Sequence, residues 1–374
     1  MESLFKSKLM ILRRQFFQLV EPAQLQWLDG SILKQPETQS WIYDHLFNAD
    51  EIAHLPPQRY QLRVLKLLIP KLEDSIEDLE EDVRFPSPRH GFAQAHQQPE
   101  ISDDLMSSLS SLLVANLPSE STSAQQKAYV TYAFPLHLSD EAIPQERAVT
   151  LLESRSMISS LGTTGLRTWE AALHLGAFLA SERGSAIVRG KKVLELGAGT
   201  GMLSIFCAKY LNISGIVATD GNEAVVDAIK TNSFLNGLDT DDLSRTTVRT
   251  AALKWGWPII AATFSEDYGM GLPDVVLGAD VTYDNIVIPA LASSLREFFE
   301  LNPAVQVLIA ATIRSKQTFE TFLSACRRNR FNLDLLDFPP RPEHLQDGPF
   351  YPTSTPIQIW SITRSQEPSD VFAF

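Results

Sequence analysis

A glycine-rich turn follows one of the apolar segments of the chain, and it is the first place where residue types and spacing indicate chemistry. The segment 192–196 leads into Gly197, Gly199 and Gly201, after which helical spacing begins. Glycines let a ligand approach the backbone more closely than a Cβ would permit, and a helix N-terminus offers free N–H groups. A dinucleotide-binding fingerprint would place its third glycine at Met202, so the observed spacing disfavours a pyrophosphate ligand.

An acidic residue, Asp220, ends the next apolar segment and is the strongest candidate for binding. It lies about 20 positions beyond the glycine turn, where a carboxylate can accept hydrogen bonds from both hydroxyls of an adenosine ribose. The alternative is a turn or N-cap residue before the helix predicted over 222–235, and the two roles are compatible. Glu195 is either held by backbone amides or close enough to a cofactor to bind it or to order the glycine loop.

A second candidate pair, Asp280 and Tyr283, follows a later apolar segment in the pattern Asp-x-x-Tyr. If that segment is a strand of an open α/β sheet, the pair lies at the carboxyl edge, where such folds bind ligands. The structural alternative for Asp280 is a loop residue that caps a helix beginning near 285. For Tyr283 it is an edge packing residue.

Other reaction classes find little support. Nucleophile motifs such as Gly-x-Ser-x-Gly are absent from the sequence, and no His, Cys and carboxylate set has the spacing of a metal site. Cys207 and Cys326 cannot form a disulfide framework and favour a reducing compartment. His174 lies in an apolar helical segment, so we expect a core histidine rather than a base.

The elements that must position these residues begin at about 165. Short Val, Ile and Leu runs alternate there with helical segments, which predicts parallel strands in a layered α/β sheet covered on both faces. The predicted strands are 192–196, 213–219, 246–250, 274–277, 305–311, 331–336 and 357–362. Seven strands fit one open sheet.

The first part of the chain has helical spacing instead. The predicted helices are 2–20, 22–29, 38–48, 59–82 and 102–116. Pro70 is expected to break the fourth, and a polar loop is expected over 84–100. Because a strand over 128–134 marks the change of pattern, we expect an all-α N-terminal domain over 1–125 and an α/β domain over 126–374.

The glycine turn and Asp220 also carry a resemblance to a known family. The stretch 195–201, followed by Ala-Thr-Asp at 218–220, resembles motif I and its acidic sequel in class I, or seven-β-strand, S-adenosylmethionine-dependent methyltransferases. Within that class the chain is most similar to methyltransferase family 16, and there to the branch that methylates a lysine of eukaryotic elongation factor 2. This narrowing rests on 163–172, 253–256 and 278–284. The resemblance covers roughly 128–374, and the helical region resembles that branch in layout.

The resemblance implies a Rossmann-like methyltransferase sheet and S-adenosylmethionine as the cofactor. The residues expected to bind it are Trp169, Gly197, Ala198, Gly199, Asp220, Trp255 and Ala279. On the family pattern, the glycine turn lines the amino-acid portion and the sulfur, Asp220 binds the ribose and Trp255 packs on the adenine. Trp169 would close over the cofactor, and Ala279 would approach it through its backbone. The alternative for Trp169 and Trp255 is core packing, because a buried Trp is more often a packing residue than a ligand contact. Trp257 is not assigned to the site.

The same resemblance gives Asp280 and Tyr283 the catalytic roles. A lysine ε-amine has a reference pKa of about 10.4 and attacks only when neutral, so the site must bind the ammonium, desolvate it and let a proton leave. Asp280 is expected to orient the amine, and Tyr283 to form part of the aromatic wall of a lysine channel. The helical domain is expected to recognise elongation factor 2. Alternatives are methylation of another protein, an RNA or a small molecule, and a non-catalytic binding module.

Charge and composition limit the partners. The 374 residues carry 32 basic and 45 acidic side chains, a net charge of −13, which argues against broad binding to nucleic acid or anionic lipid. No apolar run reaches the roughly 18 residues of a membrane span, and we expect a cytoplasmic monomer. The basic segment 2–20 is interpreted as a domain helix rather than a mitochondrial presequence. Acidic residues crowd 73–82, either as a solvated helix end or as a surface that steers a basic substrate.

Overall fold

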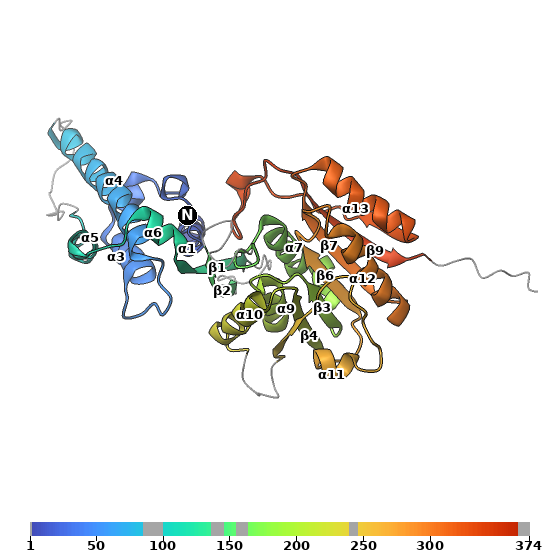
Figure 1. Cartoon of the computed structure of the whole chain (residues 1–374). Helices are drawn as coiled ribbons and strands as arrows, with labels where there is room; N and C mark the ends of the chain where they lie inside the picture. The colour runs from blue at the N-terminus through green and yellow to red at the C-terminus, as the bar shows by residue number, and fades with distance from the viewer. Residues whose placement is uncertain (1, 85–99, 136–145, 155–163, 239–245, 366–374) are drawn as a thin grey trace, which may run out of the picture. The chain divides into compact units, whose positions relative to one another are not determined.

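The computed structural model describes residues 2–84, 100–135, 146–154, 164–238 and 246–365 (Figure 1). The chain divides into two compact units, Met1–Tyr132 and Ala133–Phe374. The domain boundary near 125 stays a prediction, since compactness does not test independent folding. Thr163 of the family motif and most of the predicted loop 84–100 lie outside the described residues.

Helices build the first unit around an apolar core. They are α1 (Glu2–Phe17), α2 (Gly30–Leu33), α3 (Pro36–Ile42), α4 (Gln58–Arg84), α5 (Asp103–Val114) and α6 (Glu120–Gln125), with a 3₁₀ turn η1 (Pro22–Gln24) and a π turn η2 (Tyr43–Phe47). Leu9, Leu12 and Phe16 recur at helical spacing on α1, and all three are buried. The Phe16 ring packs against Phe47 and Tyr60, at centroid distances of 5.2 and 5.5 Å. The predicted helical start of the chain is confirmed.

Two expectations about this unit are wrong. Residues 22–29 form only η1 and then extended chain, because Leu25 and Leu28 reach the core from a non-helical backbone. The helix α4 continues through Pro70. A proline there removes one hydrogen bond, to the carbonyl of Lys66, and both residues are on the exposed face of the helix. Water can replace that bond, so the buried face of α4 keeps the helix intact.

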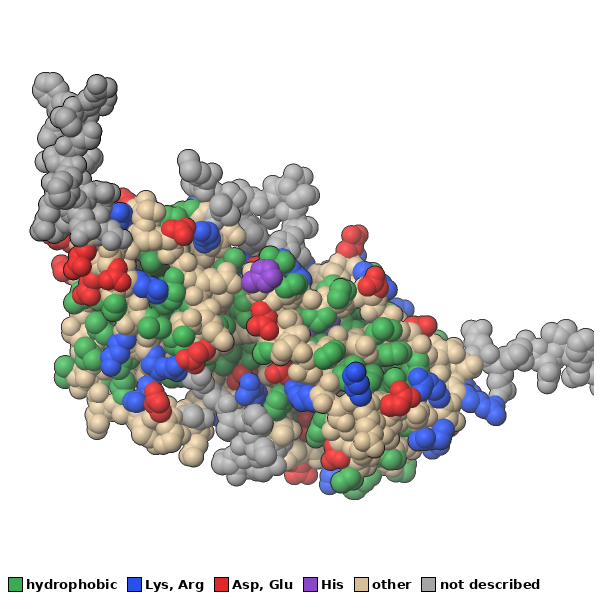
Figure 2. Space-filling model, turned by 90° about the horizontal axis from the view of Figure 1, so that it is seen from above, with side chains coloured by type: hydrophobic (Ala, Val, Ile, Leu, Met, Phe, Trp, Pro, Cys, Tyr) green, Lys and Arg blue, Asp and Glu red, His purple; other side chains and the backbone are tan. Residues whose placement is uncertain are grey.

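The end of α4 carries the acidic stretch. Glu73, Asp74 and Glu77 are exposed, and the side chains of the remaining acidic residues lie outside the described part of the chain. In the space-filling view, acidic side chains gather on the helical unit near the end where α4 lies (Figure 2). The described acidic residues are therefore solvated, as a cluster of like charges requires.

A seven-stranded sheet builds the second unit. Its strands are β3 (Lys192–Leu196), β4 (Gly215–Asp220), β5 (Val248–Ala252), β6 (Val275–Ala279), β7 (Gln306–Thr312), β8 (Phe331–Leu335) and β9 (Ile357–Arg364). The order is β5-β4-β3-β6-β7-β9-β8, and every predicted strand of this sheet is present. The first five strands in this order, β5, β4, β3, β6 and β7, pair in parallel, but β9 is antiparallel to both of its neighbours, β7 and β8. The prediction of parallel strands is wrong at the edge formed by β9 and β8. A loop with one 3₁₀ turn joins these two strands, whereas a parallel pair needs a crossover connection, usually a helix.

Helices cover both faces of this sheet, as predicted (Figure 1). They are α7 (Glu170–Ala180), α8 (Glu182–Val188), α9 (Met202–Tyr210), α10 (Glu223–Leu235), α11 (Phe264–Tyr268), α12 (Ile288–Leu301) and α13 (Lys316–Arg328). On one face, Phe264 of α11, Leu291 of α12 and Phe322 of α13 share a core with Leu196 and Val307. Figure 1 shows α7, α9 and α10 on the other face. The strands outside the sheet are β1 (Lys127–Pro135) and β2 (Glu146–Ser154), and the sequence did not predict β2. None of the helices described is long and apolar enough to span a bilayer.

Candidate active site

The register of three central strands brings the predicted site residues to one edge of the sheet. Leu196 of β3 lies beside Thr219 of β4 and Gly278 of β6, so the residues that follow these strands are neighbours. They line a cavity of about 690 Å³, a size typical of small-molecule sites. All the predicted site residues line it: Trp169, Gly197, Ala198, Gly199, Asp220, Trp255, Ala279, Asp280 and Tyr283.

The glycine turn between β3 and α9 adopts backbone angles that favour glycine. Gly197, Gly199 and Gly201 have φ values of 60°, 57° and 80°. A Cβ on Gly199 would lie 3.1 Å from the carbonyl oxygen of Gly165, and one on Gly197 would lie 3.2 Å from the Trp255 ring. Gly201 is the N-cap of α9 and has no capping side chain. The turn therefore brings the start of α9, where Met202 and Leu203 line the cavity, to the edge of that cavity.

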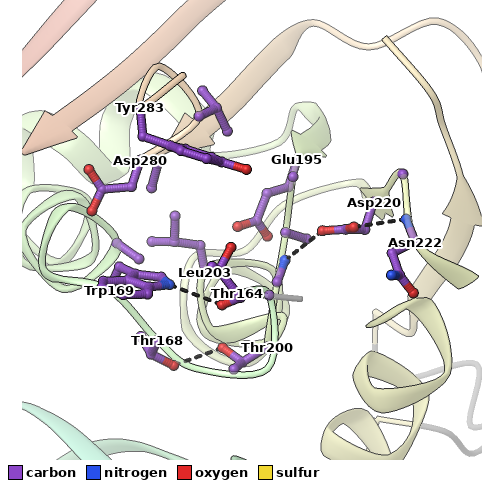
Figure 3. Close-up of a pocket in the computed structure, with 18 of the residues that line it drawn as sticks. Thr164, Thr168, Trp169, Glu195, Thr200, Leu203, Asp220, Asn222, Asp280 and Tyr283 are labelled. Atoms are coloured by element: carbon purple, nitrogen blue, oxygen red, sulfur yellow. Dashed lines mark hydrogen bonds between the residues drawn. The ribbon is translucent and has the colours of Figure 1, made fainter. Parts of the chain in front are cut away.

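Asp220 accepts backbone hydrogen bonds on both of its oxygens. Gly199 N donates to Oδ2 at 3.3 Å and Asn222 N donates to Oδ1 at 3.0 Å (Figure 3). Burial raises the pKa of Asp220, and these hydrogen bonds oppose the shift. The alternative of a turn or N-cap residue is half right: Asn222 N donates to the Asp220 side chain two residues back, as in an Asx turn, but Asn222 caps α10 by accepting from Ala224 N at 2.9 Å. Asp220 instead ties the glycine turn to the end of β4 while it lines the cavity.

Glu195 fixes the start of α9. Its Oε2 accepts hydrogen bonds from Ser204 N at 3.0 Å and Ser204 Oγ at 2.5 Å. The residue is 3% exposed, and burial raises the pKa of its carboxyl to about 7. The sequence left two roles open for Glu195, a carboxylate held by backbone amides or a contact to a cofactor. The hydrogen bond from Ser204 N supports the first role. Glu195 also lines the cavity, so a contact with a cofactor stays a prediction.

Trp169 precedes α7 and lies at the cavity rather than deep in the core. Its Nε1 donates to the carbonyl of Thr164 at 3.1 Å. The guanidinium groups of Arg167 and Arg314 lie 5.3 and 5.2 Å from its ring centroid, within cation–π distance. Figure 3 shows Trp169 and Asp280 toward one end of the cavity and Asp220 toward the other.

Asp280 follows β6 with a positive φ of 53°, and its carboxylate contacts the end of β7. Thr312 N donates to Oδ1 at 2.8 Å and Thr312 Oγ1 to Oδ2 at 3.0 Å, with Ala171 N 3.4 Å from Oδ2. Burial raises the pKa of Asp280, opposed by Thr312 and Arg314. The cap alternative is wrong, because Val287 is the N-cap of α12. Asp280 is a buried carboxylate with a fixed orientation.

Tyr283 lies at the mouth of the cavity. The residue is 61% exposed, so the packing alternative is wrong for it. Trp257, left outside the predicted site, is 65% exposed, and the Lys254 ammonium lies 5.1 Å from its ring centroid. Tyr283, which lines the cavity, therefore presents its ring at the mouth, where a bound partner could cover it.

His174 is the core residue that the sequence predicts. Its Nε2 lies 3.0 Å from the carbonyl of Phe338 and its Nδ1 lies 2.9 Å from the Tyr351 hydroxyl. Since a carbonyl only accepts, Nε2 donates, and Nδ1 accepts from the tyrosine. Burial lowers the pKa of His174 to about 4. The histidine is neutral and joins α7 to the loop after β8.

The structure adds contacts that the sequence did not indicate. Glu153 of β2 accepts from Thr168 N at 3.0 Å and Thr168 Oγ1 at 2.7 Å, and Thr168 Oγ1 lies 2.8 Å from Thr200 Oγ1. This network connects the segment before Trp169 to the glycine turn. Arg314, which lines the cavity, was also missed. Its place two residues beyond β7, at the carboxyl edge of the sheet, is the signal that could have found it.

A seven-stranded sheet with a glycine turn after the inner strand β3 and a ligand-sized cavity at its carboxyl edge defines a seven-β-strand methyltransferase fold. A family model described as lysine methyltransferase matches residues 153–329. Protein-lysine N-methyltransferase EFM3 of Chaetomium thermophilum is 44% identical over 350 residues, 94% of this chain and 96% of that protein. The chain belongs to the family of protein-lysine N-methyltransferases.

Two more distant relatives match part of the chain. Protein-lysine N-methyltransferase EFM3 of Saccharomyces cerevisiae is 32% identical over 233 residues, 58% of this chain and 66% of that protein. Human protein-lysine N-methyltransferase EEF2KMT is 33% identical over 194 residues, 50% of this chain and 56% of that protein.

Proposed function

We propose that the chain transfers a methyl group from S-adenosylmethionine to a lysine of translation elongation factor 2, as a cytoplasmic monomer. One observation carries the proposal: a single cavity has the glycine turn and Asp220 toward one end and Asp280 and Tyr283 toward the other. Methyl transfer needs a donor site and an acceptor site side by side, because both groups must be held in line and shielded from water.

The residues at the first end fit S-adenosylmethionine. Asp220 accepts hydrogen bonds from Gly199 N and Asn222 N on different oxygens, and a carboxylate has further lone pairs with which it can accept from ribose hydroxyls. Gly197 and Gly199 have no Cβ where one would crowd Trp255 and Gly165, so these residues pack closely on the turn that lines the cavity. Trp255 offers an apolar surface for adenine. When bound, the cofactor supplies an electrophilic methyl group on a sulfonium.

The residues at the other end prepare the lysine amine. Asp280 is fixed by Thr312, and its Oδ1 keeps a lone pair after accepting from Thr312 N. That oxygen can accept a hydrogen bond from the ε-amine and orient its lone pair toward the donor. The Tyr283 ring shields the amine from water, and desolvation lowers the amine pKa from about 10.4. The proton can leave to solvent at the exposed mouth, so neither residue has to be a strong base.

Sequence similarity supports elongation factor 2 as the substrate. Five residues of the motif line the cavity, namely Thr164, Gly165, Arg167, Thr168 and Trp169, and the human relative carries the name EEF2KMT. The net charge of −13 and the exposed acidic end of α4 suit a large substrate with a basic surface. Together these features favour a protein substrate over nucleic acid.

The test is methylation by the purified chain with labelled S-adenosylmethionine and purified elongation factor 2, elongation factor 1A and total RNA. We expect label on one lysine of elongation factor 2, located by peptide mapping. Asp280→Ala should lower the rate by about 100-fold or more, while Asp227→Ala, at an exposed α10 residue paired with Lys230, should not. Label on another factor or on RNA contradicts the substrate. Cofactor binding without methylation of any of these would indicate a binding module.

A further inference from the structure

Arg314 contacts Glu170 and two of the predicted site residues, Trp169 and Asp280. Its NH2 donates to Glu170 Oε2 at 2.5 Å, and its NH1 lies 3.7 Å from Asp280 Oδ1. The same guanidinium lies 5.2 Å from the centroid of the Trp169 ring. One side chain from the end of β7 thus contacts the aromatic residue expected at the cofactor and the carboxylate expected at the amine.

We propose that Arg314 is a positioning residue for methyl transfer, which fixes Trp169 and Asp280 relative to each other. The inference rests on the proposed function, since it assigns those two residues to the donor and the acceptor. A planar guanidinium suits this task because it can stack on a ring and donate in its own plane at the same time. A lysine ammonium can supply the charge but not the stack.

The charges around Arg314 support the assignment. The side chains of Asp280 and Glu170 are 9% and 22% exposed, and both contact Arg314. Burial and the nearby Glu170 each raise the pKa of Asp280, whereas Arg314 lowers it. Arg314 therefore offsets the repulsion between two partly buried carboxylates, and it keeps Asp280 able to accept a hydrogen bond.

A purely structural role predicts a different outcome. The Arg314 side chain is 44% exposed, and ion pairs between exposed groups contribute little to stability. If Arg314 served only to pair with Glu170, its replacement would leave the reaction nearly unchanged. Any other pair of opposite charges at the two positions would then serve equally well.

The test compares Arg314→Met with Arg314→Lys, with the charge-swapped double variant Glu170→Arg/Arg314→Glu and with the control Arg296→Met. Arg296 is a surface arginine on α12, 53% exposed and paired with Glu300. We expect kcat of Arg314→Met on elongation factor 2 to fall by about 10- to 100-fold with KM little changed. Arg314→Lys should be intermediate, and Arg296→Met should match the wild type.

The charge swap is the sharpest comparison. It restores an ion pair between residues 170 and 314, but it places a carboxylate beside Asp280 and removes the cation–π contact with Trp169. We expect its thermal unfolding to match the wild type and its kcat to stay as low as that of Arg314→Met. A swap that regains the wild-type kcat overturns the proposal. So does an Arg314→Met variant within about twofold of the wild type.

Calorimetry with S-adenosylhomocysteine separates failure of this inference from failure of the proposed function. If the wild type methylates no lysine of elongation factor 2, the proposed function fails, and the affinity then decides the inference. Arg314→Met should bind S-adenosylhomocysteine about tenfold more weakly than Arg296→Met, because Trp169 loses its support. Equal affinities in that case overturn the role of Arg314.

Discussion

Replacing Gly199 by alanine should weaken cofactor binding, and Gly190 provides a matched control. Both glycines have positive φ, 57° and 69°, so alanine costs about 1–2 kcal/mol of conformational strain at either position. The two positions differ in the room that they leave for an added Cβ. A Cβ on Gly199 would lie 3.1 Å from the Gly165 carbonyl oxygen, while one on Gly190 would have nothing within 4 Å.

The shared strain should lower the unfolding temperature of both variants by a few degrees, since about 1 kcal/mol corresponds to ~2–4 °C in a domain of this size. Only Gly199→Ala must also push Gly165 away from the turn and loosen the bond from Gly199 N to Asp220. Calorimetry with S-adenosylhomocysteine should then show an affinity at least about tenfold lower for Gly199→Ala, or about 1.4 kcal/mol, and none of that loss for Gly190→Ala. Equal affinities in the two variants would refute the contact between the turn and the cofactor.

Three further predictions use the same protein. Asp220→Asn should bind S-adenosylhomocysteine at least about tenfold more weakly, because the NH2 group that replaces one carboxylate oxygen only donates and cannot accept from Gly199 N or Asn222 N. Asp227→Asn, on the exposed side of α10, is the control in the same calorimetric titration. Tyr351→Phe should cost about 1–3 kcal/mol in urea unfolding, because buried Nδ1 of His174 loses its donor; an unchanged midpoint would show that the bond contributes nothing. Between pH 4.5 and 7, the free energy of unfolding of Glu195→Gln should rise relative to that of the wild type by up to about 3 kcal/mol. The native carboxyl, with a pKa raised from 4.5 to about 7, binds more protons than the unfolded one in that window, so wild-type stability falls as pH rises; parallel pH profiles in denaturant unfolding would disprove it.

The strands of the main sheet could be predicted because each is a short segment rich in apolar residues, and the inner strands β3, β4, β6 and β7 are almost fully buried. Strand direction could not, since β9 has the same apolar pattern whichever way it runs, and only the missing helix after β8 indicates its antiparallel pairing. The strand β2 was missed for a different reason. Part of its backbone bonds to side chains of α10 and of the residue that follows it: Leu152 N donates to Asn232 Oδ1 at 2.8 Å and Thr150 N to Asn236 Oδ1 at 3.3 Å. No pattern within 146–154 indicates partners that lie about 80 residues away.

The candidate site, too, could be predicted only in part. Residues that follow strands, such as Asp220 and Asp280, could be predicted because parallel strands end at one edge of the sheet. What each carboxylate contacts could not be predicted. Asp280 accepts from Thr312, which also ends a strand, but the approach of Arg314 to Glu170 depends on where α7 begins in space.

These contacts make the two ends of the cavity physically different. At the end proposed to hold the methyl donor, Asp220 and Glu195 accept hydrogen bonds from the glycine turn and from α9, so their geometry is set before a ligand binds. At the acceptor end Asp280 is equally fixed, but Tyr283 is 61% exposed and Ile286, three residues on, is 84% exposed. Exposed apolar side chains beside a cavity gain stability only when a partner covers them. A small acceptor would leave them in water, whereas a folded substrate protein that inserts a lysine would bury them. The asymmetry therefore favours a macromolecular acceptor and places the selection of substrate at the mouth, separate from the binding of the methyl donor.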